Sequence, residues 1–479
     1  MASVIERYRI ATTTSLVANG LPKRAFVPER YLSSIVVVIA LLVTGCAGLR
    51  AANAPLDRID LQSGYRPDQI VHSRPVGDVA LLLSFSGGGT RASALAYGVL
   101  EELRDTQVTV SGKRERLLDE VDVITSVSGG SFTSAYYGLH GDHTFEDFEE
   151  RFLKRKIGRN ILLQMLLPQN WLRLIFPFFD RTEMAIDYYD RQIFDGARFA
   201  DLKKAGGPLI QINSTDLSVG SRFTFIQPQF DLICSDLSEM KIARAVTASS
   251  AVPIVFPAIA LRNYAGRCGY QKPAWLDEAL ASRKQNPRRY HIASEMNAYL
   301  DPKTDPYVHL VDGGIADNLG VRGPLDNIIV EGGIWQRLRG LGVDTPHHIA
   351  FIVVDASTEP NRSFRRVPAP PSLAAVIGSM SDTQLHRYNF ETLELLNENL
   401  KRWASELSSH GAPVQAHLIE VAEYEIEDPD ERQFFDAVPT SLGLDDESVD
   451  RLVEIGRRLL RESDEFQNLL TELRRRPSK

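Results

Sequence analysis

The sequence contains little cysteine, with only Cys46, Cys234 and Cys268 among 479 residues. This content excludes a small scaffold held together mainly by disulfides. Neither Cys234 nor Cys268 has metal-ligand spacing around it, so we expect no metal site and no other cofactor. In an oxidising compartment these two residues can pair or remain buried thiols, and their spacing favours neither alternative.

The sequence also lacks any block of lysine and arginine interleaved with aromatic residues. Its formal net charge is −8, with 54 basic and 62 acidic side chains. These features exclude nucleic acid as the main partner. A hydrophobic content of 43% is enough to bury a large core, so the chain is neither disordered nor fibrous.

The apolar run near the amino terminus, residues 35–43, is shorter than the roughly 18 to 20 residues that span a bilayer. Basic residues precede the run and Thr44-Gly45-Cys46 follows it, a pattern more typical of a signal peptide than of a transmembrane helix. The end of the run resembles the lipobox of bacterial lipoproteins, which implies removal of residues 1–45 and lipidation of Cys46. We therefore expect a lipoprotein anchored to a membrane of the bacterial cell envelope, facing the periplasm from the outer membrane if the source has one. Residues 46–77 would form a tether or a strap.

Two glycine-containing turns organise the next part of the chain. Residues 79–103 have the pattern of a strand, a glycine loop and a helix, and residues 121–127 predict a second strand. The intervening segment is long enough for a right-handed crossover, which indicates an α/β fold with parallel strands. Gly87, Gly88 and Gly89 expose backbone N–H groups at the start of a helix, which suits an anion that is bound or formed during a reaction. The spacings of nucleotide-binding glycine loops are missing, so a nucleotide phosphate is the less favoured anion.

Ser128 is the best candidate for a nucleophile because it directly follows the second predicted strand. A nucleophile elbow needs small residues two positions before and two positions after the serine. Here these positions hold Ser126 and Gly130, and Ser126 replaces the usual glycine. Ser86 has similar neighbours, but the three glycines after it favour a donor loop, so we rank Ser128 ahead of Ser86.

Asp312 is the best candidate for the base that activates this serine. It ends an apolar strand and is followed by two glycines that leave it uncrowded. His309 lies three residues earlier, where strand alternation turns it to the opposite face. His347 and His348 would satisfy the order Ser, Asp, His of a triad hydrolase, but they directly precede a strand, and we interpret them as structural or exposed.

Three motifs occur in order along the chain: Ser86-Gly87-Gly88-Gly89-Thr90-Arg91, Ser126-Val127-Ser128-Gly129-Gly130 and Asp312-Gly313-Gly314. Together they resemble the motifs of the patatin-like phospholipases, a family related to the cytosolic phospholipase A group. This resemblance implies a three-layer α/β/α fold with a mainly parallel sheet and hydrolysis of lipid acyl esters by a Ser/Asp dyad without histidine. Carried over, Ser128 attacks the ester, Asp312 accepts its proton and the loop glycines 87–89 form the oxyanion hole. Arg91 either contacts a substrate phosphate or the oxyanion, or forms an ion pair at the helix start.

The remaining segments complete the predicted organisation. The apolar segment 161–179 is a candidate lid, acyl-chain pocket or membrane-facing patch, with a core helix as the equal alternative. Residues 78–371 would form the catalytic domain, and the helical spacing from residue 372 predicts a C-terminal helical extension, residues 372–479.

The sequence therefore predicts a lipid acyl hydrolase of the phospholipase A type that acts on phospholipids or related lipid esters at a membrane. Two alternatives stay open. One is a lipid-binding or envelope scaffold protein that keeps the fold without turnover, and the other is a Ser-His-Asp esterase of small esters. The sequence does not define the head group or the position of the ester that is cleaved.

Overall fold

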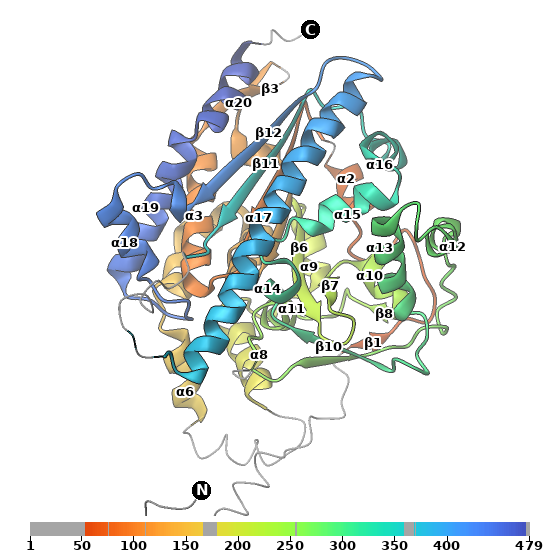
Figure 1. Ribbon diagram of the computed structural model, residues 1–479, viewed down its shortest axis with the longest axis horizontal. Helices are drawn as coiled ribbons and strands as arrows, with labels where there is room; N and C mark the ends of the chain where they lie inside the picture. Colours follow the sequence, from red (N-terminus) through yellow and green to blue (C-terminus); the bar gives the residue numbers. More distant parts are fainter. Residues whose placement is uncertain are drawn as a thin grey trace, which may run out of the picture. The chain divides into compact units, whose positions relative to one another are not determined.

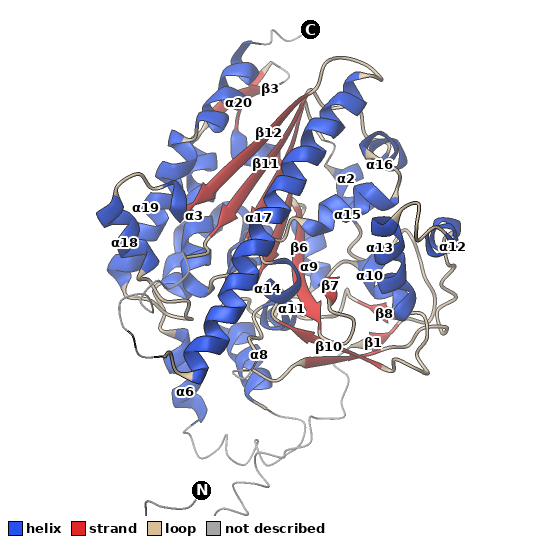
Figure 2. Cartoon of the chain, in the orientation of Figure 1, coloured by secondary structure: helices blue, strands red, loops and turns tan. Residues whose placement is uncertain are grey.

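A mixed β-sheet of eight strands lies at the centre of the computed structural model (Figures 1 and 2). The structure describes residues 53–475 except 75, 111, 166–179, 254–255, 359–367 and 369. The strand order is β12-β11-β2-β5-β6-β10-β9, and β7 pairs with β6 outside this path. The strands are β2 (Val79–Phe85), β5 (Val121–Val127), β6 (Leu209–Asp216), β7 (Ser221–Thr224), β9 (Ile259–Arg262), β10 (Tyr307–Val311), β11 (His348–Asp355) and β12 (Gln415–Ala422).

Five neighbouring strands, from β12 to β6, run parallel, whereas β7, β9 and β10 pair in antiparallel fashion. The register places Phe85 of β2 opposite Ser126 of β5, and Val127 opposite Asn213 of β6. Because the carboxyl ends of parallel strands lie at one edge of the sheet, the turns after β2 and β5 are neighbours there. The expected mainly parallel α/β sheet is confirmed.

Helices cover both faces of this sheet. Side chains of β11 alternate between the faces, as strand geometry requires. Ile352 and Val354 belong to a core that includes α3 (Gly89–Asp105), α4 (Gly129–His140) and α19 (Asp446–Glu462). Phe351 and Val353 belong to a second core with α15 (Arg322–Val330), α16 (Ile334–Leu341) and α17 (Leu373–Ser408), and Figure 2 shows α17 running across this face. The three-layer α/β/α architecture is therefore confirmed.

The C-terminal region is mostly helical, as predicted, but it also contributes to the sheet. Its helices include α17, α18 (Pro429–Asp436), α19 and α20 (Asp464–Arg475). The chain between α17 and α18 forms β12, which pairs in parallel with β11 and was not predicted from the sequence. Its two faces pack on different helices: Ile419 and Val421 belong to the core that includes α19, whereas Ala416 and Leu418 pack against the core that includes α17.

Helix α19 packs directly on α3, the helix that follows the glycine loop. The backbones approach so closely that a Cβ atom added to Gly98 would lie 2.1 Å from the carbonyl oxygen of Val453. A Cβ atom on Gly456 would lie 2.5 Å from the carbonyl oxygen of Leu95. Glycine on each helix is thus what permits this crossing.

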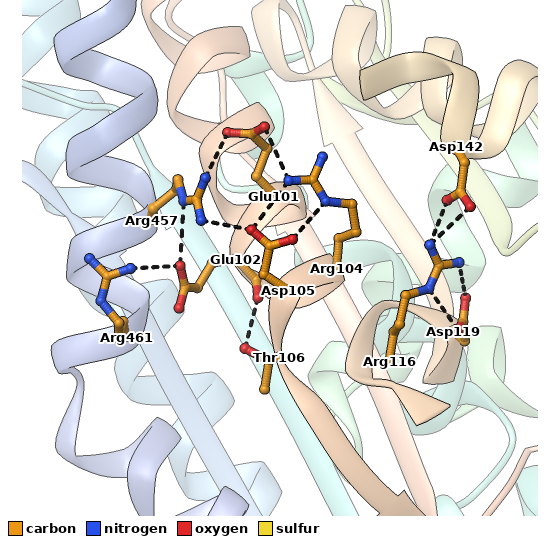
Figure 3. Close-up of polar contacts among 10 residues, drawn as sticks. All are labelled: Glu101, Glu102, Arg104, Asp105, Thr106, Arg116, Asp119, Asp142, Arg457 and Arg461. Atoms are coloured by element: carbon orange, nitrogen blue, oxygen red, sulfur yellow. Dashed lines mark hydrogen bonds and ion pairs between the residues drawn. The ribbon is translucent and has the colours of Figure 1, made fainter. Parts of the chain in front are cut away.

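Charged side chains surround the same helix contact (Figure 3). Arg457 of α19 forms ion pairs with Glu101 and Asp105 of α3, at 3.4 and 2.8 Å. Arg461 forms an ion pair of 2.9 Å with Glu102. The two arginine side chains remain partly exposed, so water screens these pairs, and we assign most of the packing energy to the apolar and backbone contacts.

The chain before β2 lies along the domain rather than apart from it. β1 (Ala54–Pro55) pairs with β8 (Ser235–Asp236). Tyr65 is buried, and its hydroxyl oxygen accepts a 2.7 Å hydrogen bond from the N–H group of Ile210 in β6. The buried ion pair between Arg66 and Asp231 has a distance of 2.7 Å. Close to this segment, a disulfide joins Cys234 to Cys268, which resolves the two alternatives left by the sequence.

Two predicted features lie largely outside the described residues. The signal peptide and lipobox, including Cys46, fall within residues 1–52, and most of the apolar segment 161–179 falls within residues 166–179. The described start of that segment belongs to α6 (Ile157–Met165), where Ile161 is buried and Leu163 is exposed. Among the described helices, none combines the length and the apolar character needed to cross a membrane.

Candidate active site

Ser128 occupies a sharp turn between β5 and α4. Its backbone has φ 47° and ψ −118°, a conformation that side-chain-bearing residues rarely adopt. The next two residues must be glycine, because a Cβ atom on Gly129 would lie 2.0 Å from the carbonyl oxygen of Gly89, and one on Gly130 would lie 2.7 Å from Phe85. Ser126 fits two positions before the turn, since its buried hydroxyl lies 2.6 Å from the hydroxyl of Ser134. The geometry is that of a nucleophile elbow.

The hydroxyl of Ser128 donates a 2.9 Å hydrogen bond to Oδ2 of Asp312. Asp312 directly follows β10, and the adjacent Gly313 approaches the backbone of Asn213, which lies opposite Val127 in the sheet. This arrangement brings two residues that are 184 positions apart in the sequence into direct contact. Both are nearly buried, with exposed fractions of 7% for Ser128 and 9% for Asp312, so water competes poorly for their hydrogen bond.

The surroundings of Asp312 control its charge. Burial raises the pKa of the Asp312 carboxyl from 3.8 to about 6, while hydrogen bonds from the Gly314 N–H and from Ser128 act in the opposite direction. The Gly314 N–H donates to Oδ1 at 2.8 Å, which leaves Oδ2 for the serine. A carboxylate with this pKa is a stronger base than an ordinary aspartate and still ionised near neutral pH.

Ser249 supports the elbow, a role that the sequence did not reveal. Its hydroxyl oxygen accepts a 2.8 Å hydrogen bond from the N–H group of Ser128 and donates to the carbonyl oxygen of Asn213 at 2.6 Å. Ser249 ends α11 (Ile242–Ser249), and the carbonyl oxygens of Ser249 and Ala251 accept from the N–H groups of Gly313 and Asp312. The run of small residues after position 247 indicates close packing in this segment. Nothing in the run distinguishes Ser249 from Ser250 as the residue that supports the elbow.

The glycine loop lies beside Ser128 and only part of it matches the prediction. Gly88 and Gly89 have φ of 145° and 63°, which favours glycine at both positions. Within the described part of the chain, their N–H groups donate to no other residue. The N–H of Gly87 instead donates to the carbonyl oxygen of Asn318 at 3.1 Å. The loop therefore offers two free donors rather than the expected three, because Gly87 is used to hold the loop against the chain after β10.

The guanidinium group of Arg91 is bound to backbone carbonyl oxygens of the protein. The residue is 3% exposed, and its guanidinium group donates to the carbonyl oxygens of Ala356 and Val438 at 2.6 to 2.9 Å. Glu423 lies 3.6 Å away as its buried ionic partner. Of the two roles expected for Arg91, the structure thus favours the ion pair over contact with a substrate phosphate or an oxyanion. The arginine joins β11, the chain after α18 and the start of α3.

The competing candidates from the sequence have other partners. The hydroxyl of Ser86 donates to the carbonyl oxygen of Gly87 and accepts from the N–H of Ala356, and it contacts no carboxylate among the residues that the structure describes. His347 and His348 lie at the start of β11, level with the start of β2, whereas Ser128 follows the end of the parallel β5. A seven-residue strand spans roughly 20 Å, so neither histidine reaches Ser128. His309 is exposed on β10.

Two segments that form backbone hydrogen bonds with Asp312 carry exposed apolar side chains. Val252 and Ile315 are 46% and 55% exposed, and they lie in the segments that contact Asp312 through Ala251 and through the turn after β10. A cavity of about 740 Å³ lies elsewhere, with Arg222, Tyr299 and Tyr388 in its lining. Neither Ser128 nor Asp312 lines that cavity, so we do not assign it to the reaction.

Comparisons with known proteins agree with this fold. The family model for patatin-like phospholipases matches residues 83–325, which is half of the chain and includes the glycine loop, Ser128 and Asp312. The chain therefore belongs to the patatin-like phospholipase family. Membership supports lipid acyl hydrolase activity in a broad sense. No curated protein sequence matches the chain.

Among solved structures, human GIVD cytosolic phospholipase A2 is similar over 89% of this chain and 68% of its own, with 12% identity and a TM-score of 0.46. The same human protein in complex with methyl gamma-linolenyl fluorophosphonate and terbium chloride is 11% identical, with a TM-score of 0.42 and coverage of 89% and 66%. These similarities concern the fold alone.

Proposed function

We propose that this protein hydrolyses the carboxylic ester bonds of phospholipids or related lipids with Ser128 as nucleophile and Asp312 as general base. The observation that supports this most directly is the 2.9 Å hydrogen bond from Ser128 Oγ to Asp312 Oδ2 at a strained turn. A hydroxyl needs a base within this distance to attack a carbonyl at neutral pH.

In the first half of the reaction, Ser128 Oγ forms a bond to the ester carbonyl carbon and its proton passes to Asp312 Oδ2. The carbonyl oxygen becomes an oxyanion and is stabilised by the N–H groups of Gly88 and Gly89. Where such donors have been removed, each contributed about 3 kcal/mol to transition-state stabilisation. The ester C–O bond then breaks, and protonated Asp312 returns the proton to the departing alcohol oxygen.

In the second half, a water molecule attacks the acyl-serine and gives a proton to Asp312. The new oxyanion uses the same two N–H donors. The bond to Ser128 Oγ breaks, the serine recovers the proton from Asp312, and the fatty acid leaves. The dyad thus needs one carboxylate that can hold a proton briefly, for which the raised pKa of Asp312 is suited.

The apolar neighbours favour a lipid over a small polar ester. Val252 and Ile315 expose apolar surface in the two segments whose backbones bond to that of Asp312, and we propose that the acyl chain of the substrate lies over this surface. Apolar surface lowers the free energy of an acyl chain that leaves water.

The test combines probe labelling with turnover. Wild-type protein should react with a fluorophosphonate serine probe and release fatty acid from phospholipid vesicles. Both signals should disappear in Ser128→Ala, and release should fall by a factor of about 10² to 10⁴ in Asp312→Asn. Two variants serve as matched controls. Ser86→Ala should still be labelled by the probe, and His347→Ala should still release fatty acid. An unlabelled wild type that releases no fatty acid would leave a lipid-binding or scaffold protein as the better interpretation.

We also propose that the protein is tethered to the bacterial envelope through a lipid on Cys46. The support is the sequence pattern of residues 35–46. Cys46→Ser should abolish metabolic labelling with palmitate and release the protein from membranes, whereas Ser128→Ala should leave both unchanged. Continued palmitate labelling of Cys46→Ser would exclude this anchor without affecting the proposed hydrolase activity.

A further inference from the structure

Three side chains from different elements converge where the parallel strands β11 and β12 begin, at the opposite end of these strands from the turns that carry the candidate active site. His348 begins β11, His417 lies near the start of β12, and Glu472 lies on α20. The two histidine side chains are buried, and Glu472 is partly exposed. His348 and His417 project from the same face of the sheet, since His417 pairs with Ala350, two residues after His348. Helix α20 packs on this face.

The three facing atoms form a nearly equilateral triangle. His348 Nδ1 lies 3.4 Å from His417 Nε2 and 3.5 Å from Glu472 Oε2. His417 Nε2 lies 3.4 Å from the same carboxylate oxygen. Each separation is long for a hydrogen bond between these groups, whose usual length is about 2.7 to 3.0 Å.

These separations match the spacing of ligands around a metal ion. A tetrahedral ion with bonds of about 2.0 to 2.1 Å holds its ligand atoms about 3.3 to 3.4 Å apart. Two imidazole nitrogens and one carboxylate oxygen are a donor set typical of Zn²⁺, with a fourth position open to water. The triangle is therefore already arranged for such an ion.

A fourth residue orients one of the ligands. Glu465 lies on α20 about two helical turns before Glu472. Its Oε1 atom is 2.8 Å from Nδ1 of His417. When Nδ1–H of His417 donates a hydrogen bond to this carboxylate, Nε2 carries no proton and its lone pair is directed toward His348 and Glu472. A histidine held by a carboxylate on its far nitrogen is the usual outer arrangement of a zinc site.

We propose that His348, His417 and Glu472 bind one divalent transition-metal ion of the zinc class, which fastens α20 to β11 and β12. The site lies at the amino ends of these parallel strands, and Ser128 lies beyond the carboxyl end of β5. The ion is therefore structural and takes no part in ester hydrolysis. This inference is independent of the proposed function. The spacing analysis of the sequence missed it because the two histidines are 69 residues apart.

The test is a calorimetric titration of the full-length protein, purified without a histidine tag and treated with a chelator, using Zn²⁺ alone. Wild type should bind one Zn²⁺ per chain and unfold at a higher temperature with the ion than without it. Glu472→Gln should remove this binding site, and Glu465→Gln should weaken it about 10- to 100-fold. The matched control is His143→Gln, which removes an exposed histidine paired with Glu146 at 3.1 Å and should bind Zn²⁺ as wild type does.

Replacement of Zn²⁺ by Co²⁺ gives a second readout, since a tetrahedral site produces intense visible absorption that an octahedral surface site does not. Circular dichroism should show that Glu472→Gln and Glu465→Gln are folded, because both positions are partly exposed. Zn²⁺ affinity that is equal in wild type and Glu472→Gln, or absence of stoichiometric binding to folded wild type, would overturn the proposal.

Discussion

Ser128 Oγ donates directly to Asp312 Oδ2 across 2.9 Å, so the serine and its carboxylate need no intervening histidine to exchange a proton. In the proposed reaction, this direct contact makes the ionisation of one buried carboxyl the switch for activity. Because burial raises the pKa of Asp312 to about 6, the base is ionised above that pH and protonated below it.

We therefore expect kcat/KM for ester hydrolysis to be constant at neutral pH and to fall about tenfold per pH unit below about pH 6. The measurement is a pH–rate profile with a soluble uncharged ester, so that vesicle charge does not change with pH. In Asp312→Asn the residual activity should lose this acidic limb.

Asp317 is the control for that profile, because its pKa is also raised to about 6 by burial. Its carboxylate accepts hydrogen bonds from the N–H groups of Gly320 and Arg322 and does not contact Ser128. Folded Asp317→Asn should keep the acidic limb. Loss of the acidic limb in Asp317→Asn would mean that the limb reports the ionisation of Asp317 and not that of Asp312.

The same pKa predicts a cost in stability. Since the pKa of Asp312 is higher in the folded chain than its ordinary 3.8, the protonated form stabilises the folded state at low pH and this contribution is lost as pH rises through about 6. At neutral pH and above, the ionised buried carboxylate costs about 3 kcal/mol.

Asp312→Asn should therefore unfold with a free energy up to about 3 kcal/mol larger than wild type at about pH 8, and with no gain below about pH 4. An asparagine can still accept from the Gly314 N–H with Oδ1 and donate to Ser128 with Nδ2. Urea denaturation at the two pH values measures the difference. A wild type that is more stable than this variant at the higher pH would contradict the argument.

Backbone strain at the elbow predicts a difference between two inactive variants. Ser128 has φ 47° and ψ −118°, which costs a residue with a Cβ atom about 1 to 3 kcal/mol and costs glycine little. Ser128→Gly should thus be more stable than Ser128→Ala by about 1 to 3 kcal/mol, less the entropy that glycine gains in the unfolded chain. Urea denaturation of both variants tests this, and a Ser128→Gly variant that is less stable than Ser128→Ala would mean that the turn is not strained.

The sequence predicted the parts of the site that depend on local geometry. The glycines at 87–89, the elbow around Ser128 and the strand end at Asp312 each have a local pattern because a turn or a helix start restricts which residues fit. The observed Ser128–Asp312 contact follows from these patterns together with the family resemblance.

The contacts that depend on packing between distant segments had no such signal. Three such contacts join residues more than a hundred positions apart. They are the hydrogen bond from the Gly87 N–H to Asn318, the hydrogen bond from the Ser128 N–H to Ser249, and the buried contact of Arg91 with Glu423. The pairing of β12 with β11 likewise depends on tertiary context, since an edge strand with mixed polarity is a weak pattern.

The crossing of α3 and α19 predicts that two glycines hold the C-terminal region in place. A Cβ atom at Gly98 or Gly456 would meet the backbone of the other helix at 2.1 or 2.5 Å. We expect Gly98→Ala and Gly456→Ala each to lower the free energy of unfolding by about 1 to 3 kcal/mol or more.

Gly340→Ala is the matched control for these two variants, because this glycine lies in helix α16 with open space around its Cβ position. It should raise the free energy of unfolding by about 0.5 to 1 kcal/mol, since alanine favours the helix. Thermal and urea unfolding of the three variants measure these differences. Equal changes in the free energy of unfolding in all three would contradict the role given to Gly98 and Gly456.

Arg91 distinguishes a structural role from a catalytic one. Its removal leaves the buried carbonyl oxygens of Ala356 and Val438 without their donors. It also takes the nearby positive charge from Glu423, whose pKa is raised by burial to about 8 and which is then neutral at pH 7. Arg91→Ala should therefore lower the free energy of unfolding by about 1 to 3 kcal/mol for each of these two carbonyl oxygens, and Arg91→Met combined with Glu423→Gln, which keeps the volume of both side chains, should recover part of that loss. Where the variants remain folded, KM for a phospholipid and for an uncharged ester should change by the same factor, because the guanidinium group is bound to the carbonyl oxygens of Ala356 and Val438. A rise in KM confined to the phosphate-bearing substrate would instead place Arg91 in contact with the head group.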